Sequence, residues 1–128
     1  MSGGPVLAIG IDLVEVDRIR SAHFRWGKCF LARIFTEKEI AHCLARQNPY
    51  PSLAARFAGK EAVAKALGSG FGREISFRSV EIFSDGGPPS VRLLPPASGR
   101  MVRLGGKDLL ISLSHSGSLA IGQAILLG

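Results

Sequence analysis

The chain opens with a short apolar run, from Val6 to Ile11, which lies between Pro5 and Asp12. A run of this length with such flanking residues is typical of a strand that is buried on both faces. Residues 13–22 then alternate apolar and charged side chains at helical spacing, which predicts an amphipathic helix. The pattern therefore predicts a strand that ends in a Gly-Ile-Asp turn, with Asp12 at the end of the strand.

The next segment contains a helix start signal. Thr36 and Glu39 match the capping box S/T-x-x-E, and the helical period continues beyond them, which predicts a helix from about Glu37 to Ala45. Pro49 and Pro51 then interrupt the pattern, because proline lacks an amide donor and disfavours the α region in the residue before it.

A longer helix follows the prolines, from about residue 53 to residue 67, with Ser52 as its expected N-cap. Most of its side chains are small or apolar, so it should be buried on most sides. The glycine-rich stretch 68–72 is expected to end it, since glycine readily adopts the left-handed conformation of a helix terminus. The same stretch can also be interpreted as a phosphate cradle, although it lacks the Walker A pattern.

From Ile75 onward the apolar period changes to two, which is typical of half-buried strands. This pattern predicts two hairpins with a short helix between them: segments 79–83 and 90–94, a helix over 97–104, and segments 109–113 and 119–127. His115 would lie in the turn of the second hairpin, either as a hydrogen-bonded turn residue or as part of a polar site.

Composition indicates one domain over residues 1–128, because 46% hydrophobic residues can form a core without disulfides or a metal. Cys29 and Cys43 have no neighbouring cysteine or histidine pair at the spacing of zinc ligands. Neither lies in a sequence pattern that would activate its thiol as a nucleophile. We expect a reducing compartment. No apolar run approaches the ~20 residues of a membrane span, so we expect a cytoplasmic protein with no membrane partner.

The 16 Lys and Arg residues outnumber the 10 Asp and Glu residues, which gives a net charge of +6 and a pI near 10.0. Such a charge favours an anionic partner, whether nucleic acid, an acidic protein, a phosphorylated ligand or a membrane surface. In proteins that bind single-stranded nucleic acid, aromatic residues are usually interleaved with basic ones, and here only 7% of residues are aromatic. A basic surface is expected after the first strand, at Arg18, Arg20, Arg25 and Lys28.

The long helix carries the main candidate chemistry. Glu61 and Lys65 are four residues apart and share a helix face, either as an exposed ion pair or, because the helix is largely apolar, as the lining of a cleft. Asp12 is the second candidate carboxylate, and it can also act as a helix N-cap. Two carboxylates beside a lysine suit a site for magnesium and a diphosphate, and no set of soft zinc ligands is present.

Four segments, in this order along almost the whole chain, resemble the holo-[acyl-carrier-protein] synthases, the small bacterial class of the 4′-phosphopantetheinyl transferases. They are residues 9–19 (Ile-Gly-Ile-Asp-Leu-Val-Glu-Val-Asp-Arg-Ile), 35–39, 56–66 and 111–116. The Asp and the Lys-Glu-x-x-x-Lys elements are shared across the superfamily, whereas the N-terminal segment and the chain length indicate the small class. Gly59 departs from the pattern, because alanine is the more familiar residue there.

The resemblance implies an α+β fold in which an antiparallel sheet packs against the long central helix and shorter helices. It implies transfer of the phosphopantetheine group of coenzyme A to a serine of apo acyl carrier protein, with release of 3′,5′-ADP, in support of fatty acid biosynthesis. Asp12 and Glu61 would bind Mg²⁺ and Lys65 the diphosphate. Other phosphates of coenzyme A would be bound by Arg56, Lys60 and His115.

The resemblance also implies a homotrimer with active sites at subunit interfaces. The acidic carrier protein would dock on Arg18, Arg20, Arg25 and Lys28, so the positive charge requires no nucleic acid. The base for the serine proton stays open between Glu61, a metal-bound water and His115. Two other classes also stay open: a non-catalytic basic module that binds anions or nucleic acid, and a structural trimer without activity.

Overall fold

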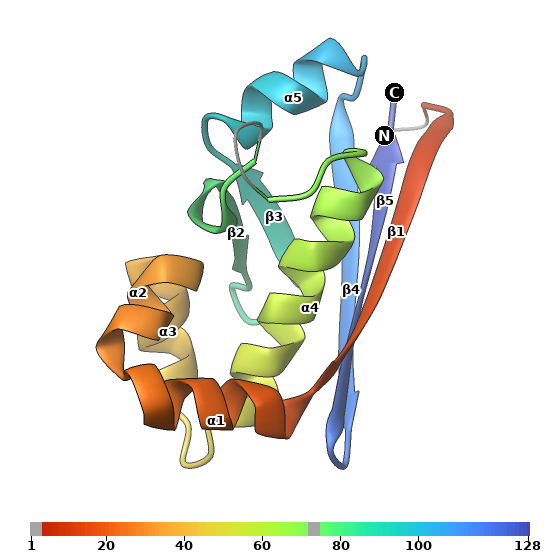
Figure 1. Cartoon of the computed structure of the whole chain (residues 1–128). Helices are drawn as coiled ribbons and strands as arrows, with labels where there is room; N and C mark the ends of the chain where they lie inside the picture. The colour runs from red at the N-terminus through yellow and green to blue at the C-terminus, as the bar shows by residue number, and fades with distance from the viewer. Residues whose placement is uncertain (1–3, 72–74) are drawn as a thin grey trace.

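The structure is a computed structural model that describes residues 4–71 and 75–128. Its elements confirm the α+β class (Figure 1). In chain order they are β1 (Val6–Glu15), α1 (Val16–Trp26), α2 (Lys28–Ile34), α3 (Glu37–Leu44), α4 (Tyr50–Ala66), the 3₁₀ turn η1 (Phe77–Ser79), β2 (Val80–Phe83), β3 (Ser90–Leu93), α5 (Ala97–Arg103), β4 (Asp108–Ser116) and β5 (Leu119–Leu127). Within the described ranges, no helix has the length and apolar character needed to span a bilayer.

The main sheet has three antiparallel strands in the order β1-β5-β4, and α4 lies across one of its faces (Figure 1). No other described element covers the opposite face. The strands β2 and β3 form a separate antiparallel pair, as the alternating pattern predicts, and this pair contacts both α4 and β4. The core therefore consists of α4 enclosed between the main sheet and the remaining helices and strands.

The first strand is longer than predicted and is exposed on one face. β1 pairs with β5 through Glu15, so Asp12 lies inside the strand, opposite Gly122, and not at its end. Alternate side chains on the outer face are exposed: Ile9 by 65%, Ile11 by 55% and Leu13 by 60%. The expectation of a strand buried on both faces was wrong, because only the face toward α4 is covered.

The predicted turn and cap positions also need correction. α4 begins at Tyr50, with Pro51 in its first turn, where a helix needs no amide donor, and Ser52 is inside the helix. His115 is in strand β4 opposite Ala120, and the turn is at Gly117 and Ser118. The short helix α2 was not predicted. The capping box that starts α3 is confirmed, and Gly68, with φ of +70°, follows the end of α4.

The helix and the sheet approach each other through glycine. A Cβ atom on Gly122 would lie 2.5 Å from the backbone nitrogen of Gly59, and one on Gly10 would lie 2.0 Å from the carbonyl oxygen of Ala62. Neither position can hold a larger residue unless the backbone moves. At Gly59 a Cβ would meet the Ile82 side chain at 2.6 Å, so the glycine at this position permits close packing.

We expect Gly122→Ala to reduce the free energy of unfolding by about 1–3 kcal/mol, because the added methyl group overpacks a backbone contact. Chemical denaturation followed by circular dichroism measures this loss. Gly87→Ala is the matched control, since a Cβ at this exposed loop position meets no atom within 4 Å. Equal stability of the two variants would contradict the close helix–sheet contact.

Candidate functional site

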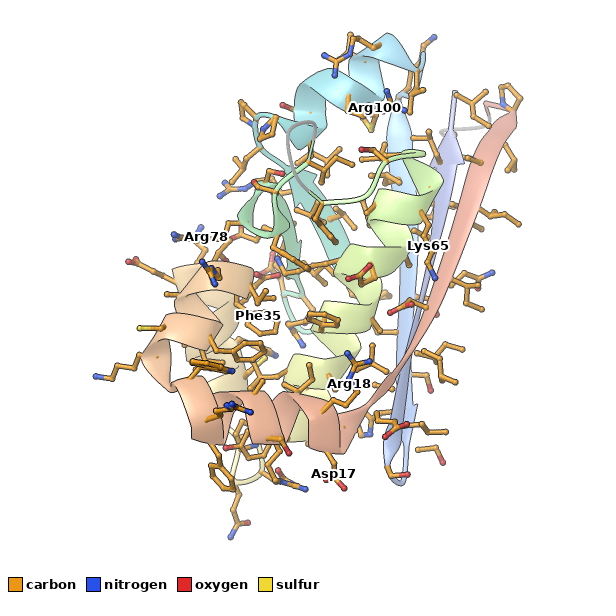
Figure 2. The ribbon with its side chains drawn as sticks, viewed as in Figure 1. Asp17, Arg18, Phe35, Lys65, Arg78 and Arg100 are labelled. Atoms are coloured by element: carbon orange, nitrogen blue, oxygen red, sulfur yellow. The ribbon has the colours of Figure 1, made fainter. Side chains whose placement is uncertain are left out.

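The fold brings the sequence-predicted carboxylates together between β1 and α4. Asp12 points from β1 toward α4 and keeps a side-chain exposure of 20%. Lys65 reaches across from α4 (Figure 2), and its Nζ donates to Asp12 Oδ1 at 3.1 Å and to the Ile11 carbonyl oxygen at 2.9 Å. Glu61 lies one helical turn before Lys65 on the same face of α4. These three residues form a cluster that we call the carboxylate site.

Burial and a neighbouring carboxylate both act against the charged form of Glu61. Burial raises the pKa of Glu61, and the negative charge of Asp12 raises it further. The positive charges of Lys65 and Arg18 act in the opposite direction. The ionised form of Glu61 is therefore disfavoured by its surroundings, and a cation between the two carboxylates would relieve their repulsion.

The donor set fits a hard cation. Both carboxylates offer only oxygen, and in the part of the chain that the structure describes no three His, Cys, Asp or Glu residues are grouped to hold a metal. Zn²⁺ sites usually have three or four protein ligands. Mg²⁺ takes one or two carboxylates and completes its octahedron with phosphate oxygens and water. The carboxylate site therefore fits Mg²⁺ bound together with a phosphorylated ligand.

A second cluster lies toward the start of α4, where the helix meets β4. It lines a pocket of about 250 Å³ whose polar side chains come from three segments: Arg46, Asn48, Ser52, Arg56, Ser114 and His115. Arg56 is only 6% exposed. Its Nη1 donates to Ser52 Oγ at 2.9 Å, whereas its buried Nε has no hydrogen-bond partner among the described residues.

An unpartnered buried guanidinium nitrogen indicates a missing acceptor, because buried polar groups are nearly always hydrogen-bonded. Nearby, the pKa of His42 is lowered by desolvation and by the positive charges of Arg56 and Arg46. Positive charge is thus concentrated at this pocket. The arrangement suits an anion, and we call it the anion pocket.

Arg46 and Asn48 were not selected from the sequence. Arg46 and Asn48 immediately precede the break at Pro49, and the only available signal was an arginine beside a turn that leads into the candidate helix. Their place in the pocket depends on how this turn packs against β4, which periodicity does not specify.

The structure does not bring Lys60 to either cluster. Its ammonium group is fully buried and pairs with Glu39 at 2.8 Å. The expected contact between Lys60 and a phosphate of coenzyme A therefore has no support in this geometry. The remaining basic candidates lie on α1 and α2: Arg18, Arg25 and Lys28 are exposed, and Arg20 is half-buried over the Tyr50 ring.

Comparisons with known proteins agree over nearly the whole chain. The profile of the 4′-phosphopantetheinyl transferase superfamily matches residues 8–122. The holo-[acyl-carrier-protein] synthase of Chlamydia trachomatis serovar D is 46% identical over 120 residues, which cover 94% of this chain and 98% of that protein. The corresponding protein of Chloroherpeton thalassium is 41% identical over 121 residues, which cover 94% and 97%.

Two solved structures are similar in fold. The crystal structure of holo-[acyl-carrier-protein] synthase from Neisseria meningitidis has a TM-score of 0.89 and 30% identity, and covers 97% of this chain and 100% of its own. That of the Helicobacter pylori enzyme, in complex with coenzyme A, has a TM-score of 0.81 and 33% identity, and covers 92% and 98%.

The anion pocket predicts a ligand-dependent titration. Inorganic phosphate, and more strongly coenzyme A, should raise the pKa of His42 toward its ordinary value of about 6.5, because a bound anion offsets the charges of Arg46 and Arg56. Histidine NMR spectra recorded across pH measure this change. His23, which is hydrogen-bonded to Tyr50, serves as the internal control. An unchanged His42 titration at saturating coenzyme A would contradict the pocket's role.

Proposed function

Because the chain belongs to the 4′-phosphopantetheinyl transferase superfamily, we propose that it transfers the 4′-phosphopantetheine group of coenzyme A to a serine of an apo acyl carrier protein. The reaction releases 3′,5′-ADP and supports fatty acid biosynthesis. The observation that carries this proposal is the carboxylate site, in which Asp12 from β1 meets Glu61 and Lys65 from α4.

In the proposed reaction, the serine oxygen forms a bond to the β-phosphorus of coenzyme A as the bond from that phosphorus to the bridging oxygen breaks. Asp12 and Glu61 would hold Mg²⁺, which when bound neutralises charge on the diphosphate. Lys65 already lies at Asp12 and would donate to a diphosphate oxygen. The serine proton leaves to a base that the geometry does not assign.

The anion pocket would bind a different part of coenzyme A. Besides its diphosphate, coenzyme A carries one further phosphate on the ribose, and this group matches the charge of Arg46 and Arg56. Nε of Arg56 would find its missing acceptor there. We assign His115 to this pocket, which it lines together with Arg56. In this assignment His115 binds substrate and does not deprotonate the serine.

The uncovered face of the main sheet supports a homotrimer. Ile9, Ile11 and Leu13 expose contiguous apolar surface on β1, and large exposed apolar patches mark association sites. Leu13 and His115 line one shallow pocket at the edge of this face. Two further copies packed there would cover the apolar surface and place the active sites beside subunit interfaces.

The exposed basic residues of α1 and α2 suit the acidic carrier protein. Arg25 and Lys28 are exposed to solvent, and Arg18 lies close enough to Glu61 to affect its pKa. A carrier protein docked on Arg18, Arg20, Arg25 and Lys28 would therefore sit next to the carboxylate site. Such charges mainly raise the association rate and fix the orientation of the partner.

Incubation with coenzyme A, Mg²⁺ and an apo acyl carrier protein should add one phosphopantetheine to the carrier, as seen by intact mass. Asp12→Ala and Glu61→Ala should reduce the rate at least about 100-fold, because each removes a ligand of the metal. Asp85→Ala, in an exposed loop, is the matched carboxylate control. Absence of transfer with several apo carriers, or transfer that persists after chelation of the metal, would refute the proposal.

The association state gives a second prediction. Light scattering should give three times the 13.6 kDa mass of one chain, and Ile9→Glu should yield monomers because it places a charge on the apolar sheet face. Val102→Glu is the control, since Val102 is 73% exposed on α5, away from this face. A native protein that is monomeric at micromolar concentration would contradict the trimer.

A further inference from the structure

A second lysine–carboxylate pair lies inside the protein, on a different side of α4. Lys60 Nζ and Glu39 Oε1 are 2.8 Å apart, and both side chains are 0% exposed. Lys60 directly precedes Glu61, so their side chains leave the helix about 100° apart. The Lys60 side chain points toward α3 and β2, and the Glu61 side chain points toward the carboxylate site.

All three donors of the Lys60 ammonium have partners in the protein. They are Glu39 Oε1, the Phe77 carbonyl oxygen at 2.9 Å and the Val80 carbonyl oxygen. The ring of Phe35 lies beside α4 (Figure 2), and its centroid is 5.8 Å from Lys60 Nζ. Lys60 therefore has no donor left for a ligand.

Glu39 is equally well satisfied. Its Oε1 also accepts from the backbone nitrogen of Thr36 at 2.8 Å, and its Oε2 accepts from the backbone nitrogen of Ile82 at 2.8 Å. The pair thus joins α4 to the start of α3 and to β2. A further contact extends it, since Thr36 Oγ1 donates to Glu81 Oε2 at 2.6 Å.

Stability alone does not account for this pair. Taking two charges out of water costs free energy, and apolar residues of similar volume often stabilise a protein as well or better. Burial accordingly lowers the pKa of Lys60, against the opposing effect of Glu39. What a charged pair adds is direction, because each hydrogen bond fixes both distance and angle.

The helix needs such a directional constraint. The side of α4 that meets the sheet is formed by small residues such as Ala58, Gly59 and Ala62, which offer few projections to prevent rotation. We propose that Lys60 and Glu39 are positioning residues, which fix the rotation of α4 and hold Glu61 and Lys65 against Asp12. The inference rests on the proposed function for its catalytic meaning, but metal binding alone can test it.

The test variant is Glu39→Gln/Lys60→Met, which removes both charges and keeps one side-chain oxygen, so that one of the two amides of Thr36 and Ile82 retains its acceptor. Mn²⁺ affinity is measured by electron paramagnetic resonance with saturating coenzyme A. We expect a folded protein whose Mn²⁺ affinity is at least about tenfold weaker, the range found when groups that orient metal ligands are changed. Leu53→Ala is the control, because it makes a cavity at a fully buried position of α4 and should leave Mn²⁺ affinity unchanged.

Native Mn²⁺ affinity in the folded double variant, or an equal loss in Leu53→Ala, would overturn the positioning role. If the double variant does not fold, Glu39→Gln alone decides, with weaker Mn²⁺ binding expected and native affinity contradicting the proposal. A native chain that binds Mn²⁺ but transfers no phosphopantetheine would refute the proposed function, while the variants would still decide the positioning role. A native chain that binds no Mn²⁺ would overturn both.

Discussion

The contact between α4 and the main sheet is the constraint on which the rest of the structure depends. Gly10 and Gly122 let the helix backbone touch the sheet, where any Cβ atom would collide with it. Asp12 and Glu61 project from these two touching surfaces, and a separation larger by one methyl group would move them apart. Short side chains such as aspartate can meet a helix residue only because the backbones are this close.

The charged groups on α4 are of two kinds: some have all their hydrogen-bond partners inside the protein, and others do not. Lys60 and Glu39 have their partners inside the protein and leave nothing for a ligand. Glu61 instead faces a second negative charge, and Nε of Arg56 is buried without an acceptor among the described residues. These two groups need partners of opposite charge, and they lie five residues apart along the helix. A ligand that carries phosphate groups and a bound divalent cation would supply both.

Local signals predicted much of the fold, because they depend on neighbouring residues. The capping box at Thr36 and Glu39 and the alternation around β2 and β3 are of this kind. The length of β1 could not be predicted locally, since pairing with β5, about 110 residues away, carries the strand through Asp12. The exposed face of β1 was likewise not predicted. A run of apolar residues has the same sequence pattern whether the second face of the strand lies in the core of the chain or on its surface.

The candidate site shows the same division. The choice of Asp12, Glu61 and Lys65 came from residue types and a family resemblance, and the fold places them together. The direction of Lys60 could not be predicted, because a helix that is apolar on most sides gives no indication of which charged residue faces inward. Arg46 entered the anion pocket only through the packing of a turn against β4.

Anomalous diffraction from crystals grown with Mn²⁺ and coenzyme A would test the central claim most directly, which is that Asp12 and Glu61 jointly hold a divalent cation. The account predicts one anomalous peak per chain, within about 2.2 Å of a carboxylate oxygen of each residue, where Mg²⁺ would bind at slightly shorter distances. A peak at only one of the two carboxylates, or at neither, would contradict it.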